Sequence, residues 1–350
     1  MAPHYYGGQA VIEGVMMRGA DTWAVAARSP AGDIYVERHP VPDLPTRRPI
    51  LRRPMLRGVY ALVDAMSIGI KALGISARVA MPEDEVSDGA ARSAIGGGLA
   101  LALVFFVGIF IVLPNAVLAF ARGLLGDGAV YHTVEGLLRI AIFLAYLSAI
   151  SLLADIRRVF AYHGAEHKTI AAWEAGEPLE PAVVDRYSTL HVRCGTNFLI
   201  MTMVLALFVY SVAGFVVPAP EGIGWLGAVV YHVGLRIALL PVVAGLAYEG
   251  IRLGAARGDQ WWVRALMEPG LWLQRITTRQ PEPEMIEVAI RAFEAVVPPG
   301  DLDGRLGSLP STVVLAEDGA HPRESLLVPD QPQETTADPK GAGPEEGDGL

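Results

Sequence analysis

Four long apolar stretches restrict the fold of this chain more than any other feature. A helix that crosses the hydrocarbon core of a bilayer needs about 20 mostly apolar residues. Of the 350 residues, 52% are hydrophobic and only 19% are charged, which is too apolar for an ordinary soluble domain. The sequence therefore predicts a mainly α-helical, polytopic membrane protein with about four transmembrane helices. They are expected between Arg92 and Arg122 and over residues 136–154, 196–217 and 225–249.

The Lys and Arg residues around these stretches predict the orientation, because such residues concentrate on the cytoplasmic side of a membrane. The segment before the first stretch and the 157–195 loop are rich in them, whereas the 122–135 loop has only Arg122 and the 218–224 loop has none. Both termini and the 157–195 loop are then cytoplasmic. The first residues lack the basic segment and apolar run of a cleavable signal peptide. We therefore expect a multi-pass protein of the bacterial inner (cytoplasmic) membrane.

Residues 1–92 are expected to form a small N-terminal cytoplasmic α+β domain. Gly7–Gly19 has a short apolar core between glycines and predicts a strand. Trp23–Arg28 and Ile34–His39 flank a turn-forming segment and predict a hairpin. Apolar residues recur at helical spacing over Pro54–Val79, which predicts a helix that lies on the membrane or packs on the bundle.

The membrane domain is expected over residues 93–256, and two further regions follow it. Residues 257–297 contain tryptophans among arginines and then an amphipathic pattern over Pro283–Val297, which predicts cytoplasmic interfacial and amphipathic helices. Residues 298–350 are rich in Pro, Gly and acidic side chains and predict a disordered tail. This acidic tail accounts for most of the net charge of −9, so the charge indicates no basic ligand, and no nucleic-acid partner is expected.

Residues 163–167, His-Gly-Ala-Glu-His, indicate a chemistry more directly than any other segment. On a helix, His163 and His167 are four residues apart and share a face, and Glu166 points the same way. This is the H-x-x-E-H pattern of a metal site with its own base. The histidines would bind a divalent ion, with zinc as the first choice, and Glu166 would move a proton from water to the leaving group. The competing interpretation is a polar interfacial helix whose histidines contact lipid headgroups or backbone carbonyls.

A catalytic zinc ion usually has three protein ligands and one open position, so a third ligand is needed. His191 and Cys194 precede the third apolar stretch on the same side of the membrane, and we place His191 ahead of Cys194. Cys194 is the single cysteine, and a free cysteine is more often a small buried apolar residue. Glu249 is a further candidate by its side of the membrane alone. Glu174 lies about 10 Å along the helix from His167, too far to share the ion.

His232 and Arg236 lie one helical turn apart within the fourth apolar stretch. An arginine inside the bilayer is costly unless it is paired, so such residues face a bundle interior or a polar cavity. Two roles are open for this intramembrane polar site: a contact to a substrate or headgroup, or a structural hydrogen-bond hub. The hub would use polar side chains of the second stretch, namely Tyr146, Ser148 or Ser151.

Glu13 and Arg18 stand between the glycines of Gly7–Gly19. The segment lacks the GxxxxGK[ST] pattern of a phosphate-binding loop. The two charged side chains either line an N-terminal site or pair with each other, and pairing is the simpler expectation.

Four sequence blocks, taken in order, resemble those of the YqhQ-like family of uncharacterised bacterial integral membrane proteins. They are GGQAVIEGVMMRG at 7–19, LRGVYALVDAM at 56–66, YHGAEHKTI at 162–170 and HVRCGTNFL at 191–199. The resemblance covers residues 5–297, and since the family is catalogued as predicted metal-dependent enzymes, it implies a metal. The last block departs from the family pattern at Val192 and Asn197, where the family has Pro and Ser.

Three functions from different classes follow from these observations. The leading hypothesis is a metal-dependent hydrolase that acts at the cytoplasmic membrane surface on a lipid-linked or membrane-protein substrate. The alternative is a non-enzymatic membrane biogenesis or scaffold protein whose polar cytoplasmic face binds a protein partner. A transporter is the third hypothesis, and it depends only on His232 and Arg236.

Overall fold

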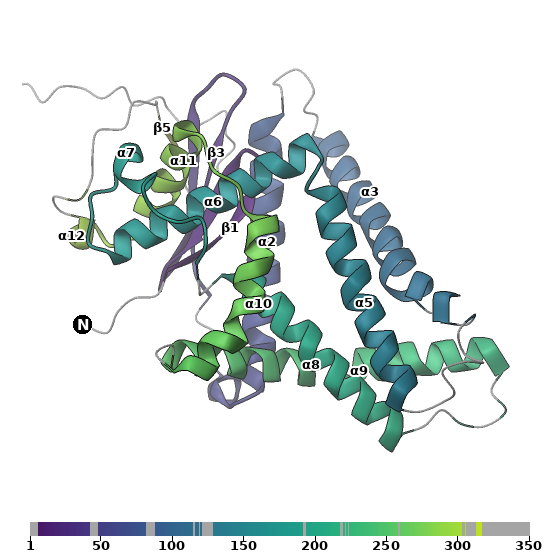
Figure 1. The fold of residues 1–350 in the computed structure, drawn as a ribbon. Helices are drawn as coiled ribbons and strands as arrows, with labels where there is room; N and C mark the ends of the chain where they lie inside the picture. Colours follow the sequence, from purple (N-terminus) through teal and green to yellow (C-terminus); the bar gives the residue numbers. More distant parts are fainter. Residues whose placement is uncertain are drawn as a thin grey trace, which may run out of the picture.

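The computed structural model consists of a five-stranded sheet with helices on both faces and a bundle of long apolar helices beside it (Figure 1). It describes residues 6–42, 48–81, 88–114, 116–118, 120, 129–191, 194–217, 220, 222, 224–257, 260–302, 305 and 313–316. The strands are β1 (Gly7–Val11), β2 (Gly14–Arg18), β3 (Thr22–Arg28), β4 (Ile34–Pro40) and β5 (Val313–Ala316).

The strands lie in the order β1-β2-β3-β4-β5, with antiparallel pairs except for the parallel pair of β4 and β5. The predicted hairpin is confirmed as β3 and β4. The single strand predicted over Gly7–Gly19 is wrong, because β1 and β2 form a second hairpin with Val11 opposite Gly14. Its turn is hard to recognise, since the left-handed position, with φ of 51°, is occupied by Glu13 and not by glycine.

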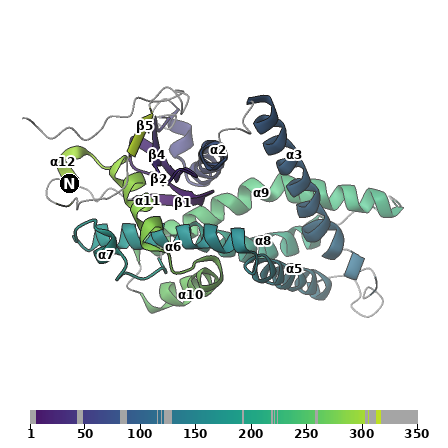
Figure 2. The ribbon, with the colours of Figure 1, turned by 90° about the horizontal axis from the view of Figure 1, so that it is seen from above.

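Alternate residues of the strands face two separate cores, as the two-residue period of a strand requires. Met16 faces the core beneath α2 (Leu56–Ala80), whereas its neighbour Met17 faces the core beneath α6 (Ala154–Glu174) and α11 (Pro283–Glu294). Figure 2 shows the sheet between α2 on one side and α6 with α11 on the other. The helices predicted over Pro54–Val79 and Pro283–Val297 are confirmed, although the apolar side of α11 packs on the sheet. We call β1–β5 with α2, α6 and α11 the sheet domain.

The apolar bundle extends away from the sheet domain (Figures 1 and 2). Among the described residues, three helices are long and apolar enough to cross a membrane, over 56–80, 133–150 and 230–253, and shorter apolar helices span 96–110 and 200–214. The chain is therefore a mainly helical membrane protein with a small α+β domain. The bundle comprises α3 (Asp88–Val107), the π-helical turn η3 (Gly108–Val112), α5 (Ala129–Ile150), α8 (Gly195–Val216) and α9 (Gly224–Ala256). The remaining elements are η1 (Pro49–Arg52), α7 (Pro181–Val184), α10 (Trp261–Thr277) and α12 (Pro299–Leu302).

Helix α2 connects the sheet domain to the bundle. One face of α2 packs along the sheet through Ile68, Ala72 and Ile75, and the helix also contacts α9. Its other face exposes apolar side chains suited to lipid, namely Val63, Met66, Ile70 and Leu73.

The predicted disordered tail is wrong for its first part. Helix α12 follows α11, and strand β5 extends the sheet beside β4. The backbone N–H of Leu179 donates to the carbonyl of Arg305 at 2.7 Å, and the Arg305 guanidinium stacks 3.7 Å from the ring centre of Trp173. Leu302 is buried in the core beneath α6 and α11, and Val313 and Val314 pack against the two cores, which explains why a segment of such polar composition is ordered. Residues 317–350 lie outside the described residues.

Arg305→Ala is expected to lower the free energy of unfolding of the sheet domain by about 1–2 kcal/mol. The variant loses the stacking on Trp173 and the hydrogen bonds from the guanidinium to the carbonyls of Trp173 and Glu177. Arg305→Lys should cost less, because it keeps the positive charge above the ring. Urea unfolding of the detergent-purified protein measures the difference, and equal midpoints for all three proteins would contradict a stabilising role of this segment.

Candidate metal centre

Helix α6 carries the His-Gly-Ala-Glu-His segment, as the spacing of its residues predicted. The helix begins at Ala154, with Asp155 in its first turn, where a carboxylate interacts favourably with the helix dipole. Its middle turns are buried because they pack against β1, β2 and α11. The imidazole rings of His163 and His167 lie edge to face, with ring centres 4.4 Å apart.

The Nδ1 atom of each histidine forms a hydrogen bond to a backbone carbonyl oxygen. His163 Nδ1 lies 2.9 Å from the carbonyl oxygen of Thr277, and His167 Nδ1 lies 2.5 Å from that of Thr189. Because a carbonyl only accepts, each Nδ1 carries the proton, so the atom that each imidazole can offer to a metal ion is Nε2. The Nε2 of His167 is buried and has no hydrogen-bond partner among the described residues. This arrangement is the one that orients histidine ligands in metal sites.

Cys194 supplies a third donor to the same place. Its Sγ lies 3.2 Å from His163 Nε2, and one donor atom from each of His163, His167 and Cys194 lies within 4.8 Å of the others. Around a tetrahedral zinc ion with bonds of about 2.0–2.3 Å, the donors are about 3.3–3.8 Å apart. These residues therefore fit a zinc ion after a contraction of about 1 Å. We call His163, His167 and Cys194 the three-donor cluster.

His191, which we placed ahead of Cys194 as the third ligand, is not in this cluster. Its Nε2 faces Glu174 at 3.5 Å, and its ring centre lies 5.7 Å from that of His167. Gln274 holds its backbone, since the Gln274 side chain accepts from the His191 N–H and donates to the His191 carbonyl, both at 2.8 Å. The third candidate, Glu249, is bound by Arg57 in an ion pair. Sequence reasoning missed Gln274, whose buried amide links α10 to this loop.

Glu166 lies beside the three-donor cluster. Its Oε2 is 3.9 Å from His163 Nε2 and 4.0 Å from His167 Nε2. Burial raises the pKa of Glu166 to about 7, although the charge of His163 and the backbone N–H of Gly8 oppose this rise. Burial and the neighbouring His163 lower the pKa of His167 to about 2, so this imidazole is neutral at physiological pH. A carboxyl group with such a pKa can both accept and donate a proton near neutral pH.

Two glycines allow the backbone to approach this site. A Cβ at Gly8 would lie 2.8 Å from Glu166 Cγ and 2.7 Å from the Met16 carbonyl oxygen, so β1 reaches Glu166 only because residue 8 is glycine. A Cβ at Gly164 would collide with the backbone carbonyl of Arg279, which follows α10. Sequence reasoning assigned no role to Gly164.

The N-terminal pair, Glu13 and Arg18, does not form. Arg18 Nη1 pairs with Asp64 of α2 at 2.6 Å. Glu13 pairs with Arg158 of α6 and accepts a hydrogen bond from the Tyr162 hydroxyl at 3.3 Å. The correction follows from the turn after β1, because Glu13 at its tip reaches α6 whereas Arg18 at the end of β2 reaches α2. Both residues join the sheet to its covering helices.

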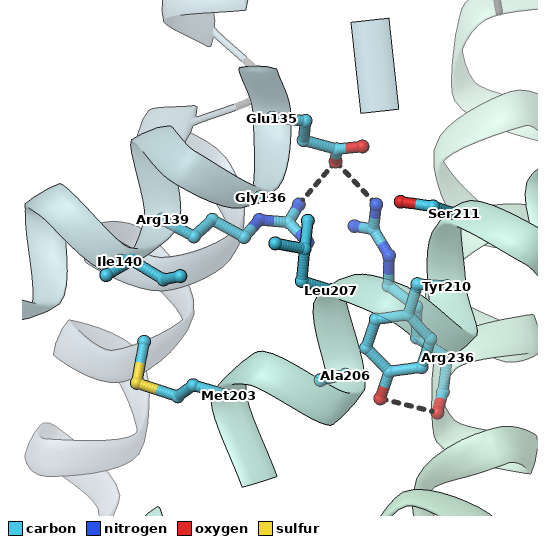
Figure 3. A pocket seen from close by; sticks show the side chains of 10 residues that line it. All are labelled: Glu135, Gly136, Arg139, Ile140, Met203, Ala206, Leu207, Tyr210, Ser211 and Arg236. Atoms are coloured by element: carbon cyan, nitrogen blue, oxygen red, sulfur yellow. Dashed lines mark hydrogen bonds and ion pairs between the residues drawn. The ribbon is translucent and has the colours of Figure 1, made fainter. Parts of the chain in front are cut away.

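In the predicted intramembrane polar site, Arg236 has partners other than those that the sequence predicted. Arg236 Nη2 pairs with Glu135 of α5 at 2.5 Å, and Arg139 Nη2 reaches the same carboxylate oxygen at 2.7 Å (Figure 3). His232 is not among the residues that line the cavity at this site. The predicted hub partners are engaged elsewhere: the ring of Tyr146 contacts Phe110, and Ser151 donates to the carbonyl of Ser148. Glu135 was missed because it stands just outside the apolar stretch that we delimited.

The fold and the site define a polytopic membrane protein with a three-donor cluster where α6 meets the end of α10 and the start of α8. Over residues 53–298 the chain matches the family described as "Protein of unknown function (DUF1385)", and it belongs to that family. It is 32% identical over 306 residues to the "Uncharacterized protein YqhQ" of Bacillus subtilis (strain 168). The aligned region covers 84% of this chain and 93% of that protein. The resemblance to the YqhQ-like family is thus confirmed. No solved structure matches the chain.

Proposed function

We propose that this protein is a metal-dependent enzyme that holds a divalent ion, with zinc as the first choice, on His163, His167 and Cys194. The observation that carries the proposal is the buried Nε2 of His167, which has no hydrogen-bond partner among the described residues and lies next to two further donors. An unpaired buried acceptor costs free energy, and a bound cation would remove that cost. Nitrogen and sulfur donors of this kind are those that zinc prefers.

The residues around the cluster suit hydrolysis. A zinc ion supplies Lewis acidity, both to water and to the bond that is broken. Glu166 would accept the proton of the attacking water and return it to the leaving group, since its Oε2 lies 3.9–4.0 Å from both Nε2 atoms. Thr189 and Thr277 keep the two imidazoles in the orientation that presents Nε2.

The substrate is proposed to be a lipid-linked molecule or a membrane protein, processed at the cytoplasmic face of the bacterial inner membrane. The support is the position of the cluster, which lies where the sheet domain meets the start of the apolar helix α8. The excess of Lys and Arg in the segments that pack into the sheet domain favours the cytoplasmic side. Both termini are then cytoplasmic.

Glu166→Gln is expected to keep zinc bound but to abolish rescue of a strain that lacks this protein. Its carboxylate lies 3.9–4.0 Å from both Nε2 atoms and outside the three-donor cluster, so its loss removes the proton acceptor while the ligands stay. Glu174→Gln is the matched control, because Glu174 lies on the same helix and pairs with His191. The measurements are zinc content by elemental analysis and growth of the complemented strain.

The same experiment separates the enzyme from the scaffold hypothesis. A scaffold needs the surface of the protein but no proton acceptor, so full rescue by Glu166→Gln would favour the scaffold. Loss of zinc in Glu166→Gln would instead assign this carboxylate as a fourth ligand. Such a closed, four-ligand site is typical of structural zinc.

A further inference from the structure

A group of three charged side chains lies inside the helical bundle, on elements other than α6. One carboxylate oxygen of Glu135 accepts hydrogen bonds from Arg139 at 2.7 Å and from Arg236 at 2.5 Å. Figure 3 shows the two guanidinium groups reaching this oxygen from opposite sides. One carboxylate against two guanidinium groups leaves one positive charge in excess. We call these three residues the arginine cluster.

The arginine cluster lies within the apolar part of the bundle. Arg139 and Arg236 lie within the apolar segments of α5 and α9, which span residues 133–150 and 230–253. Charges within such segments are costly, and in membrane proteins they mark sites for ions or substrates.

A cavity of about 130 Å³ adjoins the arginine cluster between α5, α8 and α9. One end of the cavity is formed by the charged side chains and Tyr210, whose hydroxyl donates to the Arg236 carbonyl at 3.3 Å. Ser211 and Gly136 also line the cavity, and the remainder of its wall is formed by the apolar side chains of Ile140, Met203, Ala206 and Leu207. A cavity of this size accommodates several water molecules or a small headgroup.

We propose that this cavity binds the phosphodiester group of an anionic lipid. A single negative charge would neutralise the excess positive charge, whereas a dianion would leave a negative charge buried in apolar surroundings. Guanidinium groups present paired N–H donors that match phosphate oxygens. The apolar wall suits the first methylene groups of the lipid chains, which free phosphate lacks.

The test uses the full-length protein, purified in an uncharged detergent and depleted of lipid. Phosphatidylglycerol, phosphatidylcholine and inorganic phosphate are titrated separately, and binding is followed by native mass spectrometry and by the midpoint of thermal unfolding. Phosphatidylglycerol is expected to bind and to raise the midpoint, whereas the other two do neither. Arg139→Gln leaves a neutral pair of Glu135 and Arg236, and it should weaken phosphatidylglycerol binding by about tenfold or more.

A second variant tests the cavity without removing a charge. Ala206→Phe fills the space beside the arginine cluster and is expected to abolish binding. Val204→Phe is the control, since Val204 lies on the same helix, is 48% exposed and is not a lining residue. Unchanged binding in Ala206→Phe would overturn the proposal. Equal binding of phosphatidylcholine, or binding of inorganic phosphate as tight as that of phosphatidylglycerol, would overturn the anionic lipid as the ligand.

Discussion

Replacing His163 and His167 together with alanine is expected to reduce the zinc content of the purified protein from about one ion per chain to nearly none. The two Nε2 atoms face the cluster, because both Nδ1 atoms are engaged with the carbonyls of Thr277 and Thr189. An ion that keeps only Cys194 has a single protein ligand. Elemental analysis of protein purified without chelators, normalised by amino-acid analysis, measures this loss.

Two single variants distinguish the candidates for the third ligand. Cys194→Ala should lower the zinc content strongly, because Cys194 Sγ lies 3.2 Å from His163 Nε2. His191→Ala should retain the zinc, because His191 Nε2 faces Glu174 at 3.5 Å. Zinc that survives in the double histidine variant, or wild-type protein that is isolated without metal under gentle conditions, would contradict the metal site.

Gly164→Ala is expected to lower the free energy of unfolding by about 2–3 kcal/mol, because the added methyl group overpacks a close contact. It would meet the carbonyl oxygen of Arg279 and lie 3.1 Å from Thr189 Cγ2. Backbone moves less easily than a side chain, so α6 must shift away from the segments that hold His163 and His167. The variant should therefore also bind zinc more weakly, which elemental analysis of the same preparation can show.

Gly74→Ala is the matched control and is expected to change stability in the opposite direction. Gly74 is also helical, on α2, but a Cβ there would meet no atom within 4 Å. Alanine at such a position stabilises a helix by about 0.5–1 kcal/mol. Thermal unfolding in detergent compares the two variants, and a stable Gly164→Ala would show that this contact is loose.

Local sequence patterns predicted most of the elements correctly. Apolar residues spaced by three and four positions indicated α2 and α11, and alternating residues indicated the hairpin of β3 and β4. The turn at Glu13 was missed because its left-handed residue is not glycine, and strand β5 was missed because its segment is surrounded by polar and acidic residues. A strand of four residues depends on the edge of an existing sheet for its hydrogen bonds.

The candidate site was predictable only in part, for the same physical reason. His163, Glu166 and His167 lie within about one helical turn. The helix period therefore puts them on one face, and the sequence alone predicts that they lie together. The orientation of the imidazoles depends on Thr277, which is 114 residues away from His163. No local pattern indicates such a contact, because it arises where the end of α10, which packs against α8, meets α6.

For the ion pairs, the sequence predicted that a buried charge needs a partner but not which residue the partner is. The charge of Arg236 within an apolar stretch required a partner, and this much follows from the cost of an unpaired charge in lipid. Which partner it meets depends on the packing of α5 and α9, since Glu135 is 101 residues from Arg236. Likewise, Glu13 and Arg18 are neighbours along the chain, yet each pairs with a different helix. Helix and strand periods act over a few residues through backbone hydrogen bonds and burial, whereas partners distant along the chain are selected when those elements pack together.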